Sequence, residues 1–297
     1  MSEGKRYEIT DVHVHLQDAR LGATWEEVER YVRLANEAGV TRFVCSGTSP
    51  ADWNRVRELA RRIDGVIPTF GTHPWWARKI SGETWVPVLA ELLASVVAKD
   101  GTSKAFLGEV GLDFAVEDCD EVEKREQERV LRAQLDLADA LGIPVVLHSV
   151  RANDVVLNLL SKYAHIPSLL LHNWTATQRE IERAVELGAF FSFSSRGARP
   201  NASRAKETIV NAPFDKILLE SDAPQLIPPT SSSISKRRFP PIYLQRRDSD
   251  GLLLESPASI VETGREISAL RGVSQDEFFE QLQRNEERFF QSAPRRK

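Results

Sequence analysis

Two histidines separated by a single residue follow an apolar run close to the start of the chain, in the sequence Asp11-Val12-His13-Val14-His15. Because successive side chains of a β-strand point to opposite faces, His13 and His15 project to the same side. Imidazole is a ligand of zinc, copper, iron and nickel, so the pair can bind one cation. Asp11 either orients one of the rings through its second nitrogen or lies farther from the metal. Taken alone, such a pair is more often a surface pair or a satisfied polar cluster than a metal site.

Further residues of metal-binding type recur where later apolar segments end. They are His73, Glu109, His148, His172 and Asp222. Each follows a short run of strand-forming residues, so each is predicted to close a strand. A surface pair does not account for this repetition, whereas one shared metal centre does. The remaining histidine, His165, has no such run before it, and we expect it to be an ordinary loop residue.

Composition excludes several functional classes. The chain has 297 residues, of which 41% are hydrophobic, and it can bury the core of one large domain spanning 1–297. Its net charge of −4 predicts neither a generally basic nucleic-acid binder nor an acidic disordered tail. Two cysteines, Cys45 and Cys119, are too few for a disulfide framework, which favours a reducing compartment.

The polar start of the chain, Met1-Ser2-Glu3-Gly4, lacks the apolar core of a signal peptide, and no run approaches the length of a membrane span. We therefore expect a soluble, cytoplasmic protein without a membrane partner, although the nucleus is not excluded. The sequence does not decide the oligomeric state, and a monomer is compatible with it.

Short β-rich runs alternate along the chain with amphipathic segments, which is typical of parallel strands joined by crossover helices. The predicted strands end near His15, Cys45, Thr72, Val110, His148, His172, Phe193 and Ser221. Eight β/α units predict a single (β/α)8 TIM barrel of the α/β class with an extra C-terminal helix and a long loop after strand 8. Active sites of such barrels lie at the C-terminal ends of the strands, where all the candidate ligands are expected.

Helices are predicted between and after these strands, at 24–38, 51–64, 83–98, 120–141, 152–163, 176–187, 203–211, 257–270 and 274–290. Thr24 and Glu27 have the spacing of a capping box. Gly39, Gly142 and Gly188 follow predicted helix ends, where glycine is favoured.

The combination of motifs resembles the TatD family of metal-dependent deoxyribonucleases, within the amidohydrolase-like barrels, from Asp11 to about Phe290. The motifs that carry the resemblance are Asp11-Val12-His13-Val14-His15, Gly71-Thr72-His73-Pro74, Gly108-Glu109-Val110-Gly111-Leu112-Asp113, Leu147-His148-Ser149, His172 before Trp174, and Glu220-Ser221-Asp222-Ala223-Pro224. The resemblance implies that a two-metal centre is ligated by His13, His15, Glu109, His148, His172 and Asp222, with Glu109 as the bridge. It implies that His73 meets the substrate phosphate or orients water.

The residue types support this chemistry independently of the family. Four imidazoles and two carboxylates can hold two divalent ions roughly 3.5–4 Å apart, the separation that stabilises both the attacking and the leaving oxygen. Asp222 is the best candidate to accept the proton of the attacking water. With Glu109 and His73, whose roles the resemblance implies, Asp222 makes up the set of candidate catalytic residues. Zinc fits the imidazoles, and magnesium or manganese fits the carboxylates and phosphate, so the sequence leaves the metal open.

Substrate contacts are less well defined by the sequence. Aromatic residues near the expected barrel mouth could stack unpaired bases or could simply cover the core; they are Trp75, Trp76, Phe114 and Trp174. Arginines could bind phosphate oxygens or could be solvated surface charges; they are Arg151, Arg196 and Arg199.

The long segment 225–256 is rich in proline, serine and basic residues, and it is either a flap over a nucleic-acid strand or an insertion without a catalytic role. It is also where the chain departs from the family pattern. Leu254-Glu255-Ser256-Pro257 replaces the family's Arg-Gly-Lys-Arg-Asn-Glu-Pro-like segment, and Val150 replaces an arginine that commonly follows His-Ser. The residues after His172 differ as well, so the metal ligands match the family more fully than the substrate contacts do.

We therefore predict a metal-dependent phosphodiester hydrolase that acts on DNA, as an exonuclease on single-stranded ends. Two alternatives remain: an amide or ester hydrolase of the deacylase type that uses the same two-metal centre, and a barrel that binds metal without turnover. Arginines near the scissile position would favour the phosphodiester substrate, and an uncharged pocket would favour the carbonyl substrate. The complete set of ligands, including Glu109 and Asp222, argues against the non-catalytic barrel.

Overall fold

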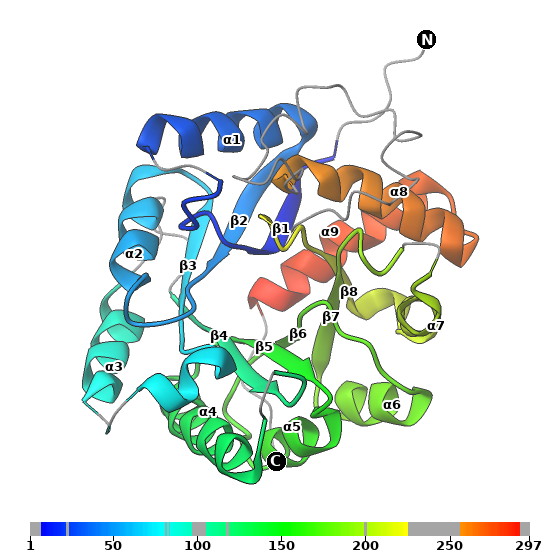
Figure 1. The fold of residues 1–297 in the computed structure, drawn as a ribbon. Helices are drawn as coiled ribbons and strands as arrows, with labels where there is room; N and C mark the ends of the chain where they lie inside the picture. Colours follow the sequence, from blue (N-terminus) through cyan, green and yellow to red (C-terminus); the bar gives the residue numbers. More distant parts are fainter. Residues whose placement is uncertain are drawn as a thin grey trace.

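The computed structural model describes residues 7–21, 24–80, 82, 84–96, 105–116, 119–198, 201–224 and 256–291. Within them, eight parallel strands follow one another around a barrel in the order of the sequence (Figure 1). The strands are β1 (Ile9–Val14), β2 (Val40–Ser46), β3 (Val66–Phe70), β4 (Phe106–Asp113), β5 (Val145–Val150), β6 (Leu169–Leu171), β7 (Ala189–Phe193) and β8 (Ile217–Leu219). The predicted (β/α)8 barrel is thus confirmed.

Helices surround the strands and separate them in the sequence. They are α1 (Trp25–Ala38), α2 (Trp53–Arg62), α3 (Trp85–Ser95), α4 (Glu121–Leu141), α5 (Asn153–Leu160), α6 (Gln178–Glu186), α7 (Ser203–Asn211), α8 (Ile260–Arg271) and the extra helix α9 (Gln275–Gln291). Short 3₁₀ helices that the sequence did not predict are η1 (Pro74–Lys79), η2 (Phe214–Lys216) and η4 (Pro257–Ser259). None of the described helices is both long and apolar enough to cross a membrane.

Local sequence signals explain several element boundaries. Thr24 and Glu27 form the predicted capping box of α1, and Gly39 ends this helix with a left-handed φ of 100°. Strands β4 and β5 continue past their predicted ends at Val110 and His148, because the two strands still pair from Gly111 to Asp113. Of the predicted loop 225–256, all but Ser256 lies outside the described residues, as does Arg199.

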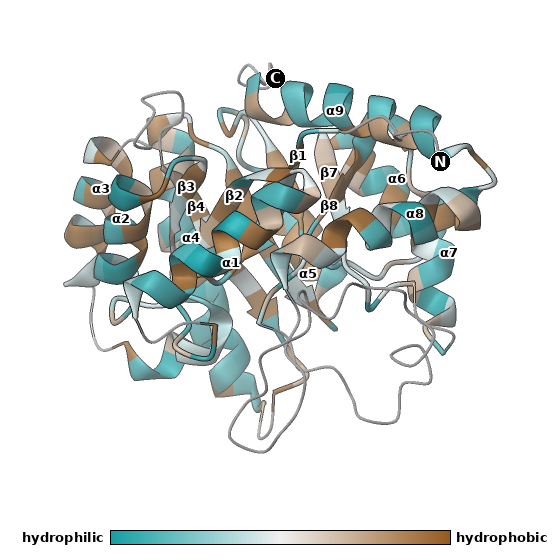
Figure 2. Cartoon of the chain, turned by 90° about the horizontal axis from the view of Figure 1, so that it is seen from above, coloured by the Kyte–Doolittle hydropathy of each residue, from teal (hydrophilic) through white to brown (hydrophobic). Residues whose placement is uncertain are grey.

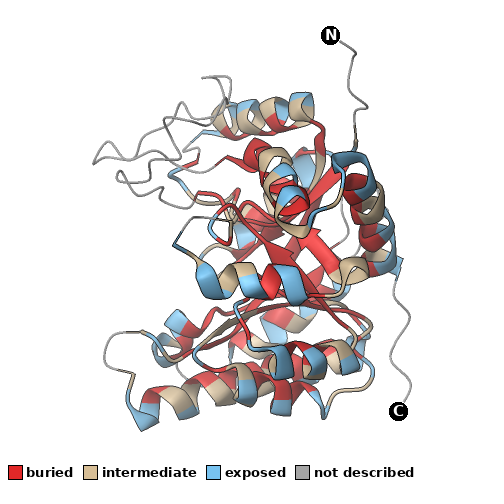
Figure 3. Ribbon diagram, turned by 90° about the vertical axis from the view of Figure 1, so that its right-hand side faces the viewer, coloured by how far each residue is buried: buried red, intermediate tan, exposed pale blue. Residues whose placement is uncertain are grey.

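The strands are buried on both faces, and the exposed residues lie on the outer faces of the helices (Figure 3). The hydropathy of the residues follows the same division (Figure 2). Such double burial is expected of parallel strands covered by helices, and it explains their continuous apolar runs.

Helix α9 covers the N-terminal end of the barrel (Figure 2). The buried ring of Phe289 lies 6.0 Å from that of Phe106 at the start of β4 and 5.5 Å from that of Phe190 near the start of β7. On the same helix, the carboxyl group of Glu286 accepts hydrogen bonds from the backbone nitrogen of Thr10 at 2.9 Å and from its hydroxyl at 2.8 Å. Burial raises the pKa of Glu286 to about 7.

Backbone hydrogen bonds close the barrel between its first and last strands. Asp222 N donates to His13 O at 3.0 Å, and His15 N donates to Ala223 O at 2.8 Å. The Asp11 carboxyl group adds to this closure, since it accepts from Ser221 N at 3.0 Å and from Ser221 Oγ at 2.5 Å. Burial raises the pKa of Asp11 to about 8. Asp11 therefore lies farther from the metal-binding atoms, and the alternative that it orients a histidine ring is wrong.

Candidate metal centre

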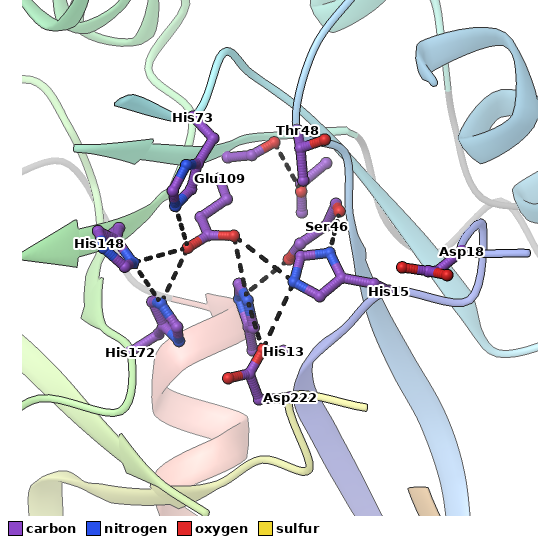
Figure 4. A network of polar contacts seen from close by, with 12 residues as sticks. His13, His15, Asp18, Ser46, Thr48, His73, Glu109, His148, His172 and Asp222 are labelled. Atoms are coloured by element: carbon purple, nitrogen blue, oxygen red, sulfur yellow. Dashed lines mark hydrogen bonds and ion pairs between the residues drawn. The ribbon is translucent and has the colours of Figure 1, made fainter. Parts of the chain in front are cut away.

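All seven side chains that the sequence predicted for the site converge at the C-terminal end of the barrel (Figure 4). Most of them lie at or just beyond a strand end, but Glu109 lies within β4, which continues to Asp113. The prediction that Glu109 closes a strand is wrong. The register of β4 against β5 shifts between Leu107 and Val110, so an irregularity in the strand accompanies the Glu109 carboxylate at the centre of the site.

The two oxygens of Glu109 face two different groups of imidazoles. Its Oε2 lies 3.4 Å from His13 Nε2 and 3.6 Å from His15 Nε2. Its Oε1 lies 3.0 Å from His148 Nδ1 and 2.9 Å from His172 Nε2. Glu109 thus stands between two sets of nitrogen donors, with one oxygen on each (Figure 4).

Asp222 completes the set around His13 and His15. Its Oδ1 lies 3.5 Å from His15 Nε2 and 3.8 Å from His13 Nε2. Its φ of 52° is left-handed, which is uncommon for a residue other than glycine and is maintained by the backbone bonds that close the barrel. Burial raises the pKa of Asp222, but the neighbouring His15, His13 and His172 together outweigh it and lower this pKa below its usual value.

Neighbouring groups fix which nitrogen of each ring faces Glu109. His15 Nδ1 lies 2.7 Å from the carbonyl oxygen of Ser46, which can only accept, so in the neutral ring Nδ1 carries the hydrogen and Nε2 presents its lone pair. His13 Nδ1 lies 3.1 Å from Ser46 Oγ, and His172 Nδ1 lies 3.3 Å from Glu220 Oε1. Among the described residues, buried His13 Nε2 has no hydrogen-bond partner. A buried nitrogen left in this state, beside two carboxylates and another imidazole, fits a metal ligand.

His148 faces Glu109 with its other nitrogen, and Asp113 accounts for the difference. His148 Nε2 lies 3.4 Å from Asp113 Oδ2, which also accepts a hydrogen bond of 2.7 Å from Trp75 Nε1. Burial raises the pKa of Asp113, but the hydrogen bonds from His148 and Trp75 outweigh it and lower this pKa to about 2. The sequence contains Asp113 within a motif, but nothing in that motif marks its position behind the ring of His148.

His73 differs from the other histidines of the site in its hydrogen bonding. Its Nδ1 accepts a hydrogen bond of 3.2 Å from the backbone nitrogen of Trp75, so the hydrogen of the neutral ring is on Nε2. That Nε2 lies 3.4 Å from Glu109 Oε1. Its distances to Glu109 and His148 would suit a ligand, but this tautomer leaves Nε2 without a free lone pair. Burial lowers the pKa of His73 and keeps its ring neutral.

The charges of the centre balance one another through shifted pKa values. Burial raises the pKa of Glu109, but the adjacent His73, His172 and His13 outweigh it and hold this pKa well below its usual value. Burial lowers the pKa of His172, but Glu109 and Glu220 outweigh it and raise this pKa well above normal. Metal ions would replace protons held in this way, so we expect metal binding to release protons.

The centre opens into a cavity of about 380 Å³. Of the alternatives that the sequence left open, Trp75, Trp76 and Arg196 line this metal cavity, and Trp75 is 60% exposed. Arg20, Gln17 and Thr48 also line it, although the sequence analysis did not single them out. The sequence marks them only by position: Gln17 and Arg20 lie two and five residues after His15, and Thr48 lies two residues after the end of β2.

Other predicted substrate contacts lie elsewhere. Trp174 is only 1% exposed and donates from Nε1 to Asn153 Oδ1 at 2.7 Å, so its proposed stacking role is wrong and it belongs to the core. Phe114 is half-buried against the core beneath Lys124 and does not line the metal cavity. Arg151 lines a neighbouring cavity.

Comparison with known proteins adds a consistent set of similarities. Residues 10–291 match the family model described as TatD related DNase. A protein of Klebsiella pneumoniae (strain 342) named 3′-5′ ssDNA/RNA exonuclease TatD is 30% identical over 237 residues, which cover 79% of this chain and 85% of the relative. Its namesake in Erwinia billingiae (strain Eb661) is 32% identical over 225 residues, covering 73% of this chain and 80% of the relative.

Solved structures share the fold at lower sequence identity. The TatD homologue YjjV from Escherichia coli K12 superposes with a TM-score of 0.78 at 23% identity, covering 95% of this chain and 98% of that one. A TatD family hydrolase from Entamoeba histolytica gives a TM-score of 0.77 at 16% identity, covering 96% and 99% of the two chains. Below 25% identity these likenesses concern the fold alone.

Proposed function

Because the chain belongs to the TatD related DNase family, we propose that it is a metal-dependent exonuclease that removes nucleotides from single-stranded DNA. The names of its relatives lead us to propose attack at the 3′ end and RNA as a second substrate. The observation that carries the proposal is the Glu109 carboxylate, which directs one oxygen to each of two groups of imidazoles.

We assign two divalent ions to this centre. His13, His15, Asp222 and Glu109 Oε2 would hold one ion; His148, His172 and Glu109 Oε1 would hold the other. The unpartnered His13 Nε2 and the ring orientations set by Ser46 and Asp113 support this assignment. When bound, such a pair of ions stabilises charge on phosphoryl oxygens and lowers the pKa of water. Imidazole favours zinc and carboxylate favours manganese or magnesium, so all three are candidates.

The remaining chemistry falls to side chains that reach the metal cavity. Asp222 has a lowered pKa, is 15% exposed at its side chain, and would accept the proton of the attacking water. The Nε2–H of His73 would donate a hydrogen bond to a phosphoryl oxygen. Arg196 adds a positive charge to the cavity wall, which favours a phosphodiester over a neutral amide or ester. Exposed Trp75 would stack on a base at the strand end.

The test is nucleotide release by metal-stripped protein after zinc, manganese or magnesium is added back. On 5′-labelled single-stranded DNA we expect a ladder that shortens from the 3′ end, and on 3′-labelled DNA we expect labelled mononucleotide. His148→Ala and Asp222→Ala should abolish release. His165→Ala is the matched control, because this exposed histidine pairs with Asp139 away from the site. A folded protein that binds two ions but releases no nucleotide would refute the proposal and direct the search to ester and amide substrates.

A further inference from the structure

A second cavity, of about 500 Å³, lies beside the metal cavity at the same end of the barrel. We call it the β5–β6 cavity; its lining includes Ser149, Arg151, Asn153, Asn173 and Arg204. Ser149 and Asn173 directly follow His148 and His172 in the chain, so this cavity begins one residue from two of the metal-facing imidazoles. A strand whose terminal phosphodiester lay at the metal centre would have its next nucleotides within reach of the β5–β6 cavity.

The charges in the β5–β6 cavity favour an anion. Its acidic residues are both engaged: Asp154 accepts from Arg183 at 2.6 Å, and Glu180 accepts from the backbone nitrogen of Thr177 at 2.6 Å. The guanidinium groups of Arg151 and Arg204 have neither an ion pair nor a hydrogen bond among the residues that the structure describes, and both side chains are exposed. Guanidinium matches the geometry of a phosphate group, so two such groups in one cavity suit a phosphodiester backbone.

The wall between the two arginines is already ordered. Asn153 Oδ1 accepts from Ser149 Oγ at 2.8 Å and from Trp174 Nε1 at 2.7 Å, while Asn153 Nδ2 donates to the Thr175 carbonyl oxygen at 3.0 Å. Asn173 Oδ1 accepts from Ser194 Oγ at 3.0 Å. A wall held in this way would lose little conformational entropy when a strand binds.

We propose that the β5–β6 cavity is a second binding site for single-stranded nucleic acid, in which Arg151 and Arg204 bind the backbone phosphates that precede the terminal phosphodiester. This inference rests on the proposed exonuclease function and deepens it. The site makes affinity depend on strand length: a dinucleotide reaches only the metal cavity, whereas a hexanucleotide reaches both cavities.

The test compares a dinucleotide with a hexanucleotide of single-stranded DNA as substrates of the metal-loaded enzyme. In the double variant Arg151→Gln and Arg204→Gln, the ratio of the hexanucleotide KM to the dinucleotide KM should rise about tenfold or more, as expected when charge-assisted hydrogen bonds are removed. The slope of log affinity against log salt for the hexanucleotide should become shallower by roughly 0.7 for each phosphate that an arginine no longer neutralises. Arg179→Gln is the matched control, because Arg179 is exposed on α6 and lines neither cavity.

An unchanged KM ratio with an unchanged salt slope would overturn the inference. So would an equal loss on both substrates, since the arginines would then act at the metal centre. If the wild type cleaves neither substrate, the exonuclease function itself is refuted, and the second site is tested by binding alone. Fluorescence anisotropy of a fluorescein-labelled hexanucleotide in EDTA then decides: weaker binding by the double variant supports the site, and equal or absent binding by both proteins rejects it.

Discussion

The two ends of this barrel differ in the side chains that fill them: one end is polar and titratable, and the other is mostly apolar. At the C-terminal end, imidazoles and carboxylates lie in contact around Glu109 and open into a cavity. At the N-terminal end, α9 packs Phe289 against Phe106 and Phe190, with Glu286 as a buried titratable group beside them. The first end concentrates groups that are costly to bury, and the second buries apolar surface that stabilises the fold.

The polar end depends on backbone hydrogen bonds for its order. Glu109 N donates to Gly47 O at 2.8 Å, His73 N to Thr48 O at 2.8 Å, and His172 N to Leu147 O at 3.0 Å. These bonds extend the barrel's ladder to residues that carry the candidate metal-binding side chains. Substitutions at opposite ends should therefore change function and stability separately.

The largest effect is expected at the polar end. Glu109→Gln removes the charge shared by the two donor groups, and we expect nucleotide release to fall on the order of a thousandfold, because several kcal/mol of charge stabilisation are lost at about 1.4 kcal/mol per factor of ten. Single-turnover rates and the metal content per chain are the measurements. Glu287→Gln, at an exposed position of α9, should leave both unchanged. A Glu109→Gln enzyme within tenfold of wild type would remove Glu109 from the centre of the mechanism.

The apolar end should show the reverse behaviour. Phe289→Ala leaves a cavity between α9 and the strand starts, and we expect it to lower the free energy of unfolding by about 3–5 kcal/mol. Nucleotide release below the unfolding transition should stay within about twofold of wild type, since Phe289 is remote from the site. Denaturant titration measures the first quantity. A loss below about 1 kcal/mol would mean that α9 does not hold this end closed.

The buried carboxyl group of Glu286 gives the apolar end a pH dependence. Its pKa is about 7 in the folded protein against an ordinary 4.5, so folding favours the protonated form, and stability should fall as pH rises from 4.5 through 7. Glu286→Gln keeps the hydrogen bond from Thr10 N and reverses the second one, since its Nε2 donates to the Thr10 hydroxyl as a protonated carboxyl group would. The substitution should stabilise the protein at pH 8 on the order of 3 kcal/mol, at about 1.4 kcal/mol per pKa unit. Unfolding of both proteins at pH 5 and pH 8 tests this. Equal pH dependence in the two would show that other groups dominate.

A smaller loss of metal affinity or activity is expected at Asp113, which contacts the side of the His148 ring that faces away from Glu109. Asp113→Asn weakens the partner of His148 Nε2, and we expect metal affinity or nucleotide release to fall about 10–100-fold, as for other groups that orient a metal-binding histidine. Competition with a chromogenic chelator measures the affinity. The half-buried Asp139, which pairs with the exposed His165 away from the site, gives the matched control Asp139→Asn. Wild-type affinity in Asp113→Asn would leave Trp75 as the main partner of this carboxylate.

Much of the fold and the site could be predicted from the sequence, because parallel strands read as uninterrupted apolar runs and their C-terminal ends meet. That reasoning placed His13, His148 and Asp222 together although they are far apart in the chain. It placed Glu109 in the site as well but put the end of its strand in the wrong place, since β4 continues to Asp113 past a register irregularity that no residue pattern marks.

Side-chain environments set the limit of the sequence analysis. Trp75 lies two residues after His73, and Trp174 lies two residues after His172. Yet Trp75 is 60% exposed and Trp174 only 1%. Nor does the sequence say which ring nitrogen faces Glu109, since Ser46 and Asp113 decide this through contacts between different strands.

The hydrogen bonds that connect the ends of β1 and β8 have a consequence for the folding of the chain during synthesis. Asp11 and Ser221, which are hydrogen-bonded to each other there, lie 210 residues apart in the sequence. Synthesis at about 5–20 residues per second separates their emergence by roughly 10–40 s. Throughout that interval the nascent chain carries His13 and His15 without Asp222, and a chain that stops short of β8 retains every histidine of the centre but not the enclosure that orients them.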